Sequence, residues 1–452
     1  MDAPLLADRI CGVLRDAGCQ AYLVGGCVRD IVLGRAAQDF DVATDATPDR
    51  VQELFPGSVG VGAAFGVILV LDPDSGAKVE VATFRTDLSY SDGRRPDAVV
   101  FGKSAEQDVR RRDFTINGLL LDPRDNRILD FVGGQDDLRA GIVRAIGNPV
   151  ERFREDKLRM LRAVRFAARF AYTIEPATFA AVREYAAEIH AVSSERVRDE
   201  LTRILTEGGA RRGFELLRQT HLLEHILPEI ARMPGVEQPP EFHPEGDVWI
   251  HTLLLLEQLP AGVSSTLAWG ALLHDVGKPP TFTAPRGPGD RIRFDRHVEV
   301  GTRMAEEIAH RLRFSGEETE RVAALVAQHL RFKDVFEMRP ATLKRFVRQP
   351  HFDEHLELHR LDCLASHRNL ESYEFVRRFL AETPAEAVRP ARLINGDDLK
   401  QLGLPPGPGY RRILEAVEEA QLDGRVTSKE QALQYVRQYA NQGQGMALPK
   451  SG

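Results

Sequence analysis

The stretch from residue 23 to residue 45, LVGGCVRDIVLGRAAQDFDVATD, constrains the fold of this chain most strongly. Leu23-Val24 is a short apolar run typical of the end of a strand, and the pair Gly25-Gly26 interrupts it. A helical pattern follows and stops at Gly34. Next, residues 39–42 alternate acidic and apolar side chains, as a half-buried strand does. The stretch therefore predicts a strand, a short helix and a second strand.

Two parts of this stretch carry groups that bind metal and phosphate. Asp39 and Asp41 lie two residues apart on the predicted strand, so their carboxylates point to one face and suit Mg²⁺, which prefers oxygen ligands. Gly25-Gly26 opens the predicted helix and exposes backbone N–H groups to an anion. A surface turn with two solvated aspartates explains either part alone. Both parts together favour a site for a triphosphate and its metal.

A predicted hairpin supplies a third acid. Residues 67–71 and 78–84 have the pattern of two strands joined by a turn at residues 72–76. Glu80 lies between two valines of the second strand, so its side chain leaves the face on which they pack. It either joins the two aspartates or is a solvated strand carboxylate, and the pattern leaves both open. The polar run at residues 88–103 predicts a mobile loop.

Length, charge and cysteine content limit the class of protein. The chain of 452 residues is long enough for about three or four domains. Its net charge of −7 means that any nucleic acid must bind at local basic patches. Four cysteines without a CxxC pair predict neither a zinc site nor a disulfide framework. Without a long apolar run or a basic N-terminal leader pattern, neither membrane insertion nor secretion is expected, and we predict a cytoplasmic protein.

From residue 148 onward the pattern is almost entirely helical, and it begins with an arginine-rich segment. Four residues of this segment recur every three positions, which predicts neighbours on one helix: Asp156, Arg159, Arg162 and Arg165. They form either a surface ion-pair ladder or a set of donors and an acceptor for the edge of a nucleotide base.

Four blocks of the sequence resemble one family in both sequence and order. LVGGCVRD…DFDVATDATP, VEVATFRTD, RRRDFTINGL and EDKLRMLRAVRFAARF resemble the bacterial class II tRNA nucleotidyltransferase (CCA-adding enzyme) and poly(A) polymerase family, over roughly residues 20–220. The resemblance implies that the catalytic acids around Mg²⁺ are Asp39, Asp41 and Glu80. It implies a nucleotide site formed by Gly25, Gly26, Arg29, Arg112, Asp113, Asp156, Arg159, Arg162 and Arg165.

The activity implied by the resemblance is addition of CCA to tRNA 3′ ends from CTP and ATP, without a nucleic-acid template. The segment SYSDGRRPD, residues 89–97, resembles the flexible element associated with the switch from C to A in CCA-adding members. The C-terminal block beginning GDDLKQLGLPPG resembles the tail of CCA-adding enzymes and favours tRNA as partner. Addition of A alone and poly(A) synthesis are the alternatives, because the shared motifs do not separate these products.

A second group of possible ligands lies in residues 245–370. It comprises one residue or pair per predicted helix or helix end: His251, His274-Asp275, His297, His329 and Asp362. The set resembles the HD phosphohydrolase superfamily, whose histidines and aspartates hold one or two divalent metals. His251, His274, Asp275 and Asp362 match the mononuclear pattern, and His297 and His329 stand where binuclear members have additional histidines.

This second resemblance implies a divalent transition metal, of a kind the sequence does not specify, and a metal-activated water that attacks a phosphoester. A structural HD fold without turnover is one alternative. A protein that is primarily an HD phosphohydrolase, with its N-terminal half retained for RNA binding, is another. The presence of all the head carboxylates speaks against the latter, because an RNA-binding module has no need of them.

We therefore expect an α+β protein with a small N-terminal nucleotidyltransferase head and an elongated all-helical body. The head has a mixed or antiparallel sheet, and the nucleotide should bind between head and neck. The sequence leaves the oligomeric state open. The expected parts are the head (1–147), a neck that binds the base and RNA (148–232), an HD metal-binding domain (245–370), a C-terminal tRNA-binding domain (385–440) and a disordered tail (441–452).

Overall fold

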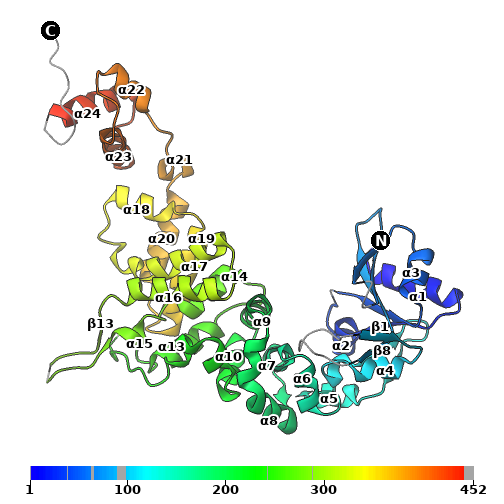
Figure 1. Ribbon diagram of the computed structural model, residues 1–452. Coiled ribbons are helices and arrows are strands. Elements are labelled where there is room, and N and C mark those ends of the chain that lie inside the picture. Colours follow the sequence, from blue (N-terminus) through cyan, green and yellow to red (C-terminus); the bar gives the residue numbers. More distant parts are fainter. Residues whose placement is uncertain are drawn as a thin grey trace. The chain divides into compact units, whose positions relative to one another are not determined.

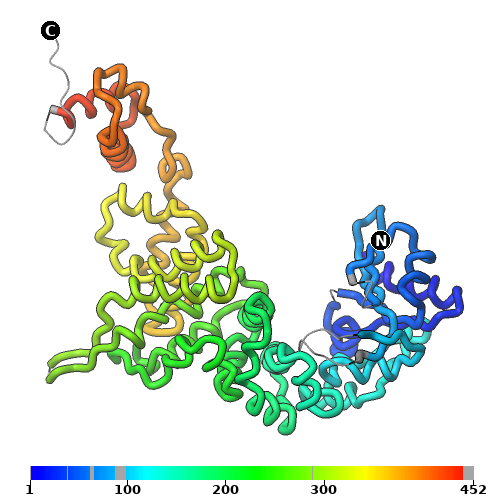
Figure 2. Tube along the Cα trace, viewed as in Figure 1, coloured from blue at the N-terminus to red at the C-terminus, as the bar shows by residue number. Residues whose placement is uncertain are grey.

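The computed structural model describes residues 2–37, 39–62, 66–88, 98–241, 243–287 and 289–441. The expected loop at residues 89–97 and the expected tail beyond Asn441 lie outside them. Figures 1 and 2 show the course of the chain and its elements. The chain forms two compact units. The first comprises residues 1–236, 247–269 and 306–319, and the second comprises residues 237–246, 270–305 and 320–452.

A mixed sheet forms the centre of the head. Its seven strands lie in the order β3 (Val59–Gly62), β4 (Val67–Leu71), β5 (Lys78–Thr83), β2 (Asp41–Thr44), β1 (Ala21–Val24), β8 (Leu119–Asp122) and β9 (Arg127–Asp130). Only β2 and β5 run parallel, and all other neighbours are antiparallel. The predicted fold class and the predicted strands at residues 23–24, 67–71 and 78–84 are confirmed.

Helices cover the sheet because each buries an apolar stripe. α1 (Ala3–Asp16) begins where the Asp2 carboxylate accepts the Leu5 N–H, and its Ile10 and Leu14 are fully buried. Burial of each such side chain contributes about 1.5–3 kcal/mol. The remaining head helices are α2 (Gly26–Val32), α3 (Pro48–Leu54), α4 (Ala105–Arg110), η2 (Thr115–Asn117) and α5 (Gly134–Ala140).

The polar run at residues 88–103 is not entirely a loop. β6 (Arg85–Leu88) and β7 (Ala98–Phe101) form an antiparallel ribbon on either side of the undescribed residues. β7 is a run of four apolar residues, most of them exposed, so it lacks the period-2 alternation of a half-buried strand.

The neck is a helical layer that continues directly from the head. Its helices are α6 (Pro149–Glu155), α7 (Leu158–Phe170), α8 (Pro176–Tyr185), η3 (Ala186–Ala191), α9 (Ser194–Thr206), α10 (Ala210–Gln219), α11 (Leu222–Ile226) and α12 (Pro228–Ala231). β11 (Thr173–Ile174) of the neck pairs in parallel with β10 (Ile142–Val143) at the end of the head. The first unit also contains α13 (Val248–Glu257). The Ile146 N–H donates to the Asp113 carbonyl oxygen at 3.0 Å, and the Thr115 N–H donates to the Arg144 carbonyl oxygen at 3.0 Å. These bonds tie the connection to the head.

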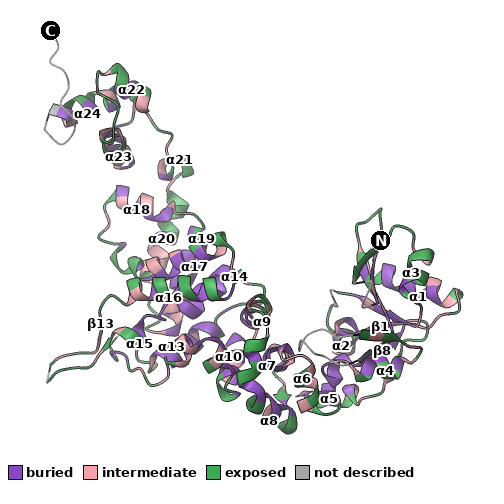
Figure 3. Cartoon of the chain, viewed as in Figure 1, coloured by how far each residue is buried: buried purple, intermediate pink, exposed green. Residues whose placement is uncertain are grey.

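The second unit is helical. Three helices contribute residues to both units: α14 (Ser265–Leu273), α16 (His297–Arg311) and α17 (Gly316–Gln328). Its other elements are α15 (Lys278–Thr281), β12 (Phe282–Thr283), β13 (Arg293–Phe294), η4 (His329–Asp334), α18 (Pro340–Val347), α19 (Phe352–Ala365), α20 (Glu371–Glu382), α21 (Ala385–Val388), α22 (Gly396–Gln401), α23 (Gly409–Leu422) and α24 (Lys429–Asn441). The helices alternate buried and exposed faces (Figure 3).

Among the described residues of the second unit, apolar side chains form cores that include the following two. Phe332, Phe346 and Phe352 form one of them with their neighbours, and the helices α22 to α24 enclose another around Leu399, Ile413 and other aliphatic side chains. No helix in the described part of the chain has both the length and the apolar character that crossing a membrane requires.

Candidate functional site

The turn between β1 and α2 brings backbone close to the predicted acids. Gly25 has a φ of +78°, a conformation that glycine adopts without strain. A Cβ at Gly25 would lie 3.8 Å from Arg112 Nη1 and 3.9 Å from Asp41 Oδ2. A glycine here therefore leaves room beside both a cation and a carboxylate.

The three predicted acids gather at one end of β2 and β5. Asp41 is the first residue of β2 and is paired in register with Glu80 of the parallel strand β5, whereas Asp39 lies just before β2 and is exposed. The expectation that Asp39 belongs to the strand is thus wrong. Burial raises the pKa of Asp41 to about 6, and the charge of Glu80 adds to this effect. The Arg112 charge opposes the shift, and Asp39 makes a smaller contribution in the same direction as Glu80.

The raised pKa of Asp41 reports mutual repulsion among these carboxylates as well as burial. A divalent cation with oxygen ligands relieves such repulsion. The carboxylates of Asp39, Asp41 and Glu80 offer oxygen ligands of the kind that such an ion binds.

Arg29, on α2, is held in place on several sides. It is 4% exposed, donates Nη1–H to Asn117 Oδ1 at 2.7 Å and Nε–H to Asp30 Oδ1 at 3.0 Å, and lies over the Phe170 ring. Asn117 was not identified from the sequence, although it lies within the block RRRDFTINGL that carries the resemblance. A guanidinium fixed in this way is preorganised for an anion.

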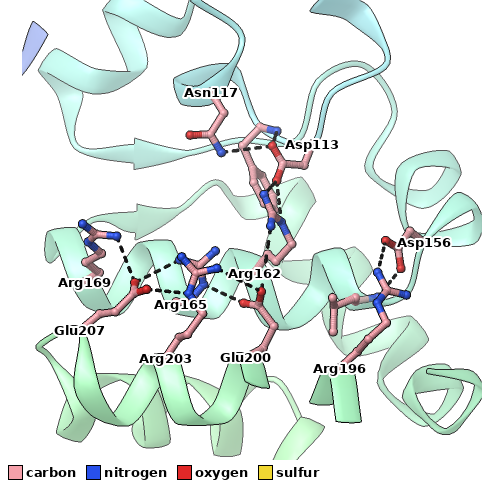
Figure 4. A network of polar contacts seen from close by, with 12 residues as sticks. Asp113, Asn117, Asp156, Arg162, Arg165, Arg169, Arg196, Glu200, Arg203 and Glu207 are labelled. Atoms are coloured by element: carbon pink, nitrogen blue, oxygen red, sulfur yellow. Dashed lines mark hydrogen bonds and ion pairs between the residues drawn. The ribbon is translucent and has the colours of Figure 1, made fainter. Parts of the chain in front are cut away.

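Asp113 joins the head to the neck helix α7 (Figure 4). Its Oδ1 accepts the Phe114 N–H at 2.8 Å and Asn117 Nδ2–H at 3.1 Å, and its Oδ2 accepts from Arg162 at 2.8 and 2.6 Å. Burial raises its pKa, but Arg162, Asn117 and Arg159 together outweigh burial and lower the pKa to about 2. With both oxygens engaged, Asp113 positions Arg162.

Asp156 is not on the same helix as the arginines that follow it. α6 ends at Glu155, Asp156 has an extended backbone, and α7 begins at Leu158. The predicted helical spacing between Asp156 and Arg159 is therefore wrong. The Asp156 Oδ2 accepts Nη2–H of Arg196 at 2.8 Å, and its Oδ1 accepts the Leu158 N–H at 3.0 Å.

The three arginines of α7 differ in their surroundings. Arg159 donates to Glu155 at 2.6 Å and to the Arg111 carbonyl oxygen at 3.1 Å. The Arg162 side chain is 32% exposed, whereas that of Arg165 is 2% exposed and forms ion pairs with two acids of the α9 region, Glu200 at 2.7 Å and Glu207 at 3.1 Å (Figure 4). Arg165 thus binds α7 to α9.

Head and neck together enclose a cavity of about 850 Å³. Of the predicted site residues it is lined by Gly25, Gly26, Arg29, Asp39, Asp41, Arg112, Asp113, Asp156, Arg159, Arg162 and Arg165. Glu80 lies outside the set of described residues that line it. Lining residues not identified from the sequence include Asn117, Arg196, Arg203 and Glu207. The last three belong to a segment with an ordinary amphipathic pattern, which does not mark them as site residues.

A separate cluster lies in the second unit around Asp275. Its Oδ1 lies 3.9 Å from His297 Nε2 and 3.8 Å from His329 Nε2, and its Oδ2 lies 3.2 Å from His274 Nε2. In each histidine Nδ1 bonds the backbone oxygen three residues earlier, at 2.7–2.8 Å. These bonds orient the Nε2 atoms toward the carboxylate, in the way that a hydrogen bond from the other ring nitrogen orients a metal-binding histidine.

The imidazoles of this cluster suit a metal. Burial, opposed by the Asp275 charge, lowers the pKa of His297, and it lowers that of His329 to about 4. Both rings are therefore neutral near pH 7, the form that binds metal. Their Nε2 atoms are buried without a hydrogen-bond partner in the described part of the chain, which a divalent ion would supply.

The other predicted HD ligands occupy separate helices. Asp362 lies on α19 in the second unit, and His251 lies on α13 in the first unit and is fully buried. Gly277 explains how His297 comes close to Asp275. A Cβ at Gly277 would lie 2.1 Å from the His297 carbonyl oxygen, so only glycine allows this approach.

Three domain families match successive parts of the chain. They are "Poly A polymerase head domain" at residues 21–144, "Probable RNA and SrmB- binding site of polymerase A" at residues 171–233, and "HD domain" at residues 247–350. These matches, with the relatives and solved structures below, support a place in the CCA-adding enzyme and poly(A) polymerase family with an HD domain. Such a head and an HD domain both imply dependence on divalent metal ions.

Curated relatives in this family include two CCA-adding enzymes. That of Limosilactobacillus fermentum is 38% identical over 265 residues, 58% of this chain and 61% of the relative. That of Bacillus subtilis is 43% identical over 214 residues, 47% of this chain and 53% of the relative. The aligned part of the chain thus spans between half and two thirds of these relatives.

Solved structures of the family extend the likeness over the whole chain. The Bacillus stearothermophilus CCA-adding enzyme in complex with CTP has a TM-score of 0.74 at 25% identity, covering 98% of this chain and 99% of that one. The Thermotoga maritima CCA-adding enzyme complexed with tRNA has a TM-score of 0.58 at 20% identity, covering 96% and 95%, and shows the shared fold.

The raised pKa of Asp41 predicts a pH-dependent metal affinity. A metal binds the ionised carboxylate, so acidification through about pH 6 should protonate Asp41 and weaken Mn²⁺ binding at the head. Mn²⁺ titration followed by electron paramagnetic resonance at pH 7.5 and 5.5 measures the effect. The difference between the parent protein and Asp41→Asn isolates the head site, and an equal difference at both pH values would contradict the prediction.

Proposed function

We propose that this protein is a tRNA nucleotidyltransferase that adds CCA to tRNA 3′ ends from CTP and ATP. The observation that carries the proposal is the cavity in which Asp39 and Asp41 of the head share a space with Asp156, Arg159 and Arg162 of the neck. The family membership supports it, as does the likeness to an enzyme in complex with CTP. A cytoplasmic location follows from tRNA as substrate.

Asp39, Asp41 and Glu80 would hold Mg²⁺, which neutralises phosphate charge and activates the attacking 3′-hydroxyl. The protein groups then bind and align the reactants. Arg29 and Arg112 donate charged hydrogen bonds to the triphosphate, and the backbone at Gly25-Gly26 lets it approach closely. Such positioning accounts for most of the protein's part in phosphoryl-type transfer.

The base is selected by groups of the neck. Cytosine and adenine each present an amino donor beside a ring-nitrogen acceptor on the Watson–Crick edge, whereas uracil presents a carbonyl oxygen beside an N–H. The Asp156 carboxylate, held by Arg196, accepts from the amino group, and Arg159 or Arg162 donates to the acceptor. Uracil would leave a buried carboxylate facing an oxygen, which is costly.

The decisive experiment supplies CTP and ATP, singly and together, to the purified protein and a tRNA that ends before CCA. We expect two C residues from CTP alone and complete CCA from both nucleotides. Asp39→Ala/Asp41→Ala should abolish both reactions. Addition of A without C would indicate an A-adding enzyme, a long A tract would indicate a poly(A) polymerase, and either result refutes CCA addition.

Asp156→Asn should relax the choice of base. An amide replaces one acceptor with a donor and removes the mismatch with uracil, so the ratio of kcat/KM for UTP to that for CTP should rise about tenfold, the effect of one hydrogen bond. Asp136→Asn makes the same chemical change at an exposed surface pair with Arg139 and serves as the control. An unchanged ratio, with activity reduced equally for all nucleotides, would argue against the base-edge role.

We further propose a metal-dependent phosphohydrolase centre in the HD domain. His274, Asp275 and Asp362 would hold one divalent transition ion, and His297 and His329 would hold a second one with Asp275. In the described part of the chain the Nε2 atoms of His297 and His329 have no hydrogen-bond partner, and they lie 3.9 and 3.8 Å from Asp275 Oδ1, which supports the second ion. Metal-activated water would attack a phosphoester there.

His297→Ala/His329→Ala tests this centre. The double variant should retain CCA addition while losing about half of the tightly bound transition metal, measured by mass spectrometry after loading with Ni²⁺ or Mn²⁺ and desalting. It should also lose hydrolysis of bis(4-nitrophenyl) phosphate. His310→Ala, at the end of α16, is the control. The same metal content in all three proteins would refute the second ion.

The proposed division of the chain remains a head (1–147), a neck (148–232), an HD domain (245–370) and a C-terminal tRNA-binding domain (385–440). The core cluster that extends from Ile394 to Val436 supports a separate C-terminal part.

A further inference from the structure

A two-stranded hairpin projects from the second unit. It connects two elements that adjoin the Asp275 cluster. Residues 282–296, here called the basic arm, connect α15 to α16, which begins at His297. β12 and β13 pair antiparallel at its base through Phe282 with Phe294 and Thr283 with Arg293. Figure 1 shows the segment around β13 extending away from α15.

The arm is basic although the chain as a whole is acidic. Its described residues include four arginines, Arg286, Arg291, Arg293 and Arg296, against two aspartates, in a chain of net charge −7. Arg286, Arg291 and Arg296 are exposed, and Arg293 is half-buried.

Asp290, one of the two aspartates, serves to shape the tip. Its carboxylate accepts the N–H groups of Arg286 and Arg291, both at 2.9 Å, and Nη1–H of Arg293 at 3.0 Å. The backbone bonds lower the pKa of Asp290. Much of its hydrogen-bonding capacity is thus used within the arm, and the tip keeps a positive surface.

The base of the arm is attached to the Asp275 cluster. The Phe294 carbonyl oxygen accepts His297 Nδ1–H at 2.8 Å, and the Phe294 ring lies 5.5 Å from Lys278 Nζ. Lys278 Nζ in turn lies 2.7 Å from Asp275 Oδ2. The base of the arm therefore adjoins this cluster, and a ligand bound along the arm extends toward it.

We propose that the basic arm binds the phosphates of an RNA strand, so that the HD centre acts on a phosphorylated RNA end rather than on free nucleotides. A single exposed ion pair contributes little, so a mononucleotide gains almost nothing from separate arginines on a projecting hairpin. An RNA chain engages several at once and releases counterions with each contact. The substrate assignment rests on the proposed phosphohydrolase function.

In the implied hydrolysis, the oxygen of one water bonds to phosphorus and the bond from phosphorus to the ribose oxygen breaks. One proton of that water ends on the ribose oxygen and the other on the released phosphate. No further reactant is needed.

The arm's contact with RNA is tested in the full chain by Arg286→Ser/Arg291→Ser. Filter binding of a tRNA transcript should weaken five- to twentyfold at low salt, and the slope of log affinity against log salt should fall by about 1–2. Arg377→Ser/Arg378→Ser, which removes two exposed arginines of α20 in the same unit, should change neither. Unchanged binding by the arm variant, or an equal loss in the control, overturns the proposal.

The substrate class is tested by two hydrolysis assays. On an RNA oligonucleotide with a 3′-phosphate the arm variant should show a raised KM with kcat retained, and on 4-nitrophenyl phosphate it should match the parent. Equal loss on both substrates overturns delivery of RNA by the arm. If the parent hydrolyses neither substrate, the phosphohydrolase and its RNA substrate both fall, and filter binding alone decides whether the arm contacts RNA.

Discussion

The ion pair between the buried Asp113 carboxylate and Arg162 is the contact on which the proposed transferase site depends. Asp113 belongs to the head and Arg162 to the neck helix α7, so the pair fixes the two walls of the cavity against each other. The Asp113 carbonyl oxygen adds a backbone bond to the connecting segment. Removal of one partner would leave a buried charge uncompensated, and the carboxylates and base-reading groups would lose their common geometry.

A network of ion pairs also connects α7 to the α9 region. Arg165 is buried between Glu200 and Glu207, and Glu207 also binds Arg169 and Arg203 (Figure 4). Such networks add little net stability compared with an apolar core, but they admit few alternative packings. The network gives α7 a defined rotation, and this rotation sets where Arg162 enters the cavity.

Much of the head follows from its sequence because its strands have strong local signals. The runs at residues 67–71 and 78–83 alternate or are wholly apolar, and the turn between them contains proline and glycine. Histidine and aspartate placed next to each other at residues 274–275 likewise indicate a metal-type site. In both cases the informative residues lie close together in the chain.

Features that depend on tertiary contacts could not be predicted in this way. The three-residue spacing continues across the break at Asp156, so periodicity did not reveal that α6 ends there. The roles of Arg196, Glu200 and Glu207 arise only because α9 packs beside α7, since their own segment has an ordinary amphipathic pattern. Residues 98–101 form a strand because β6 offers them a partner.

The parallel pairing of β2 with β5 has a consequence for the order in which the protein forms. Parallel neighbouring strands cannot be joined by a tight turn. The chain therefore passes through α3, β3 and β4 before β5 can pair with β2 and bring Glu80 beside Asp41. β1 in turn needs β8, whose residues lie about a hundred positions later. A nascent chain that has emerged only as far as β4 therefore carries two of its acids without the third, and the edge that joins Asp41 to Glu80 forms only after β5 has left the ribosome.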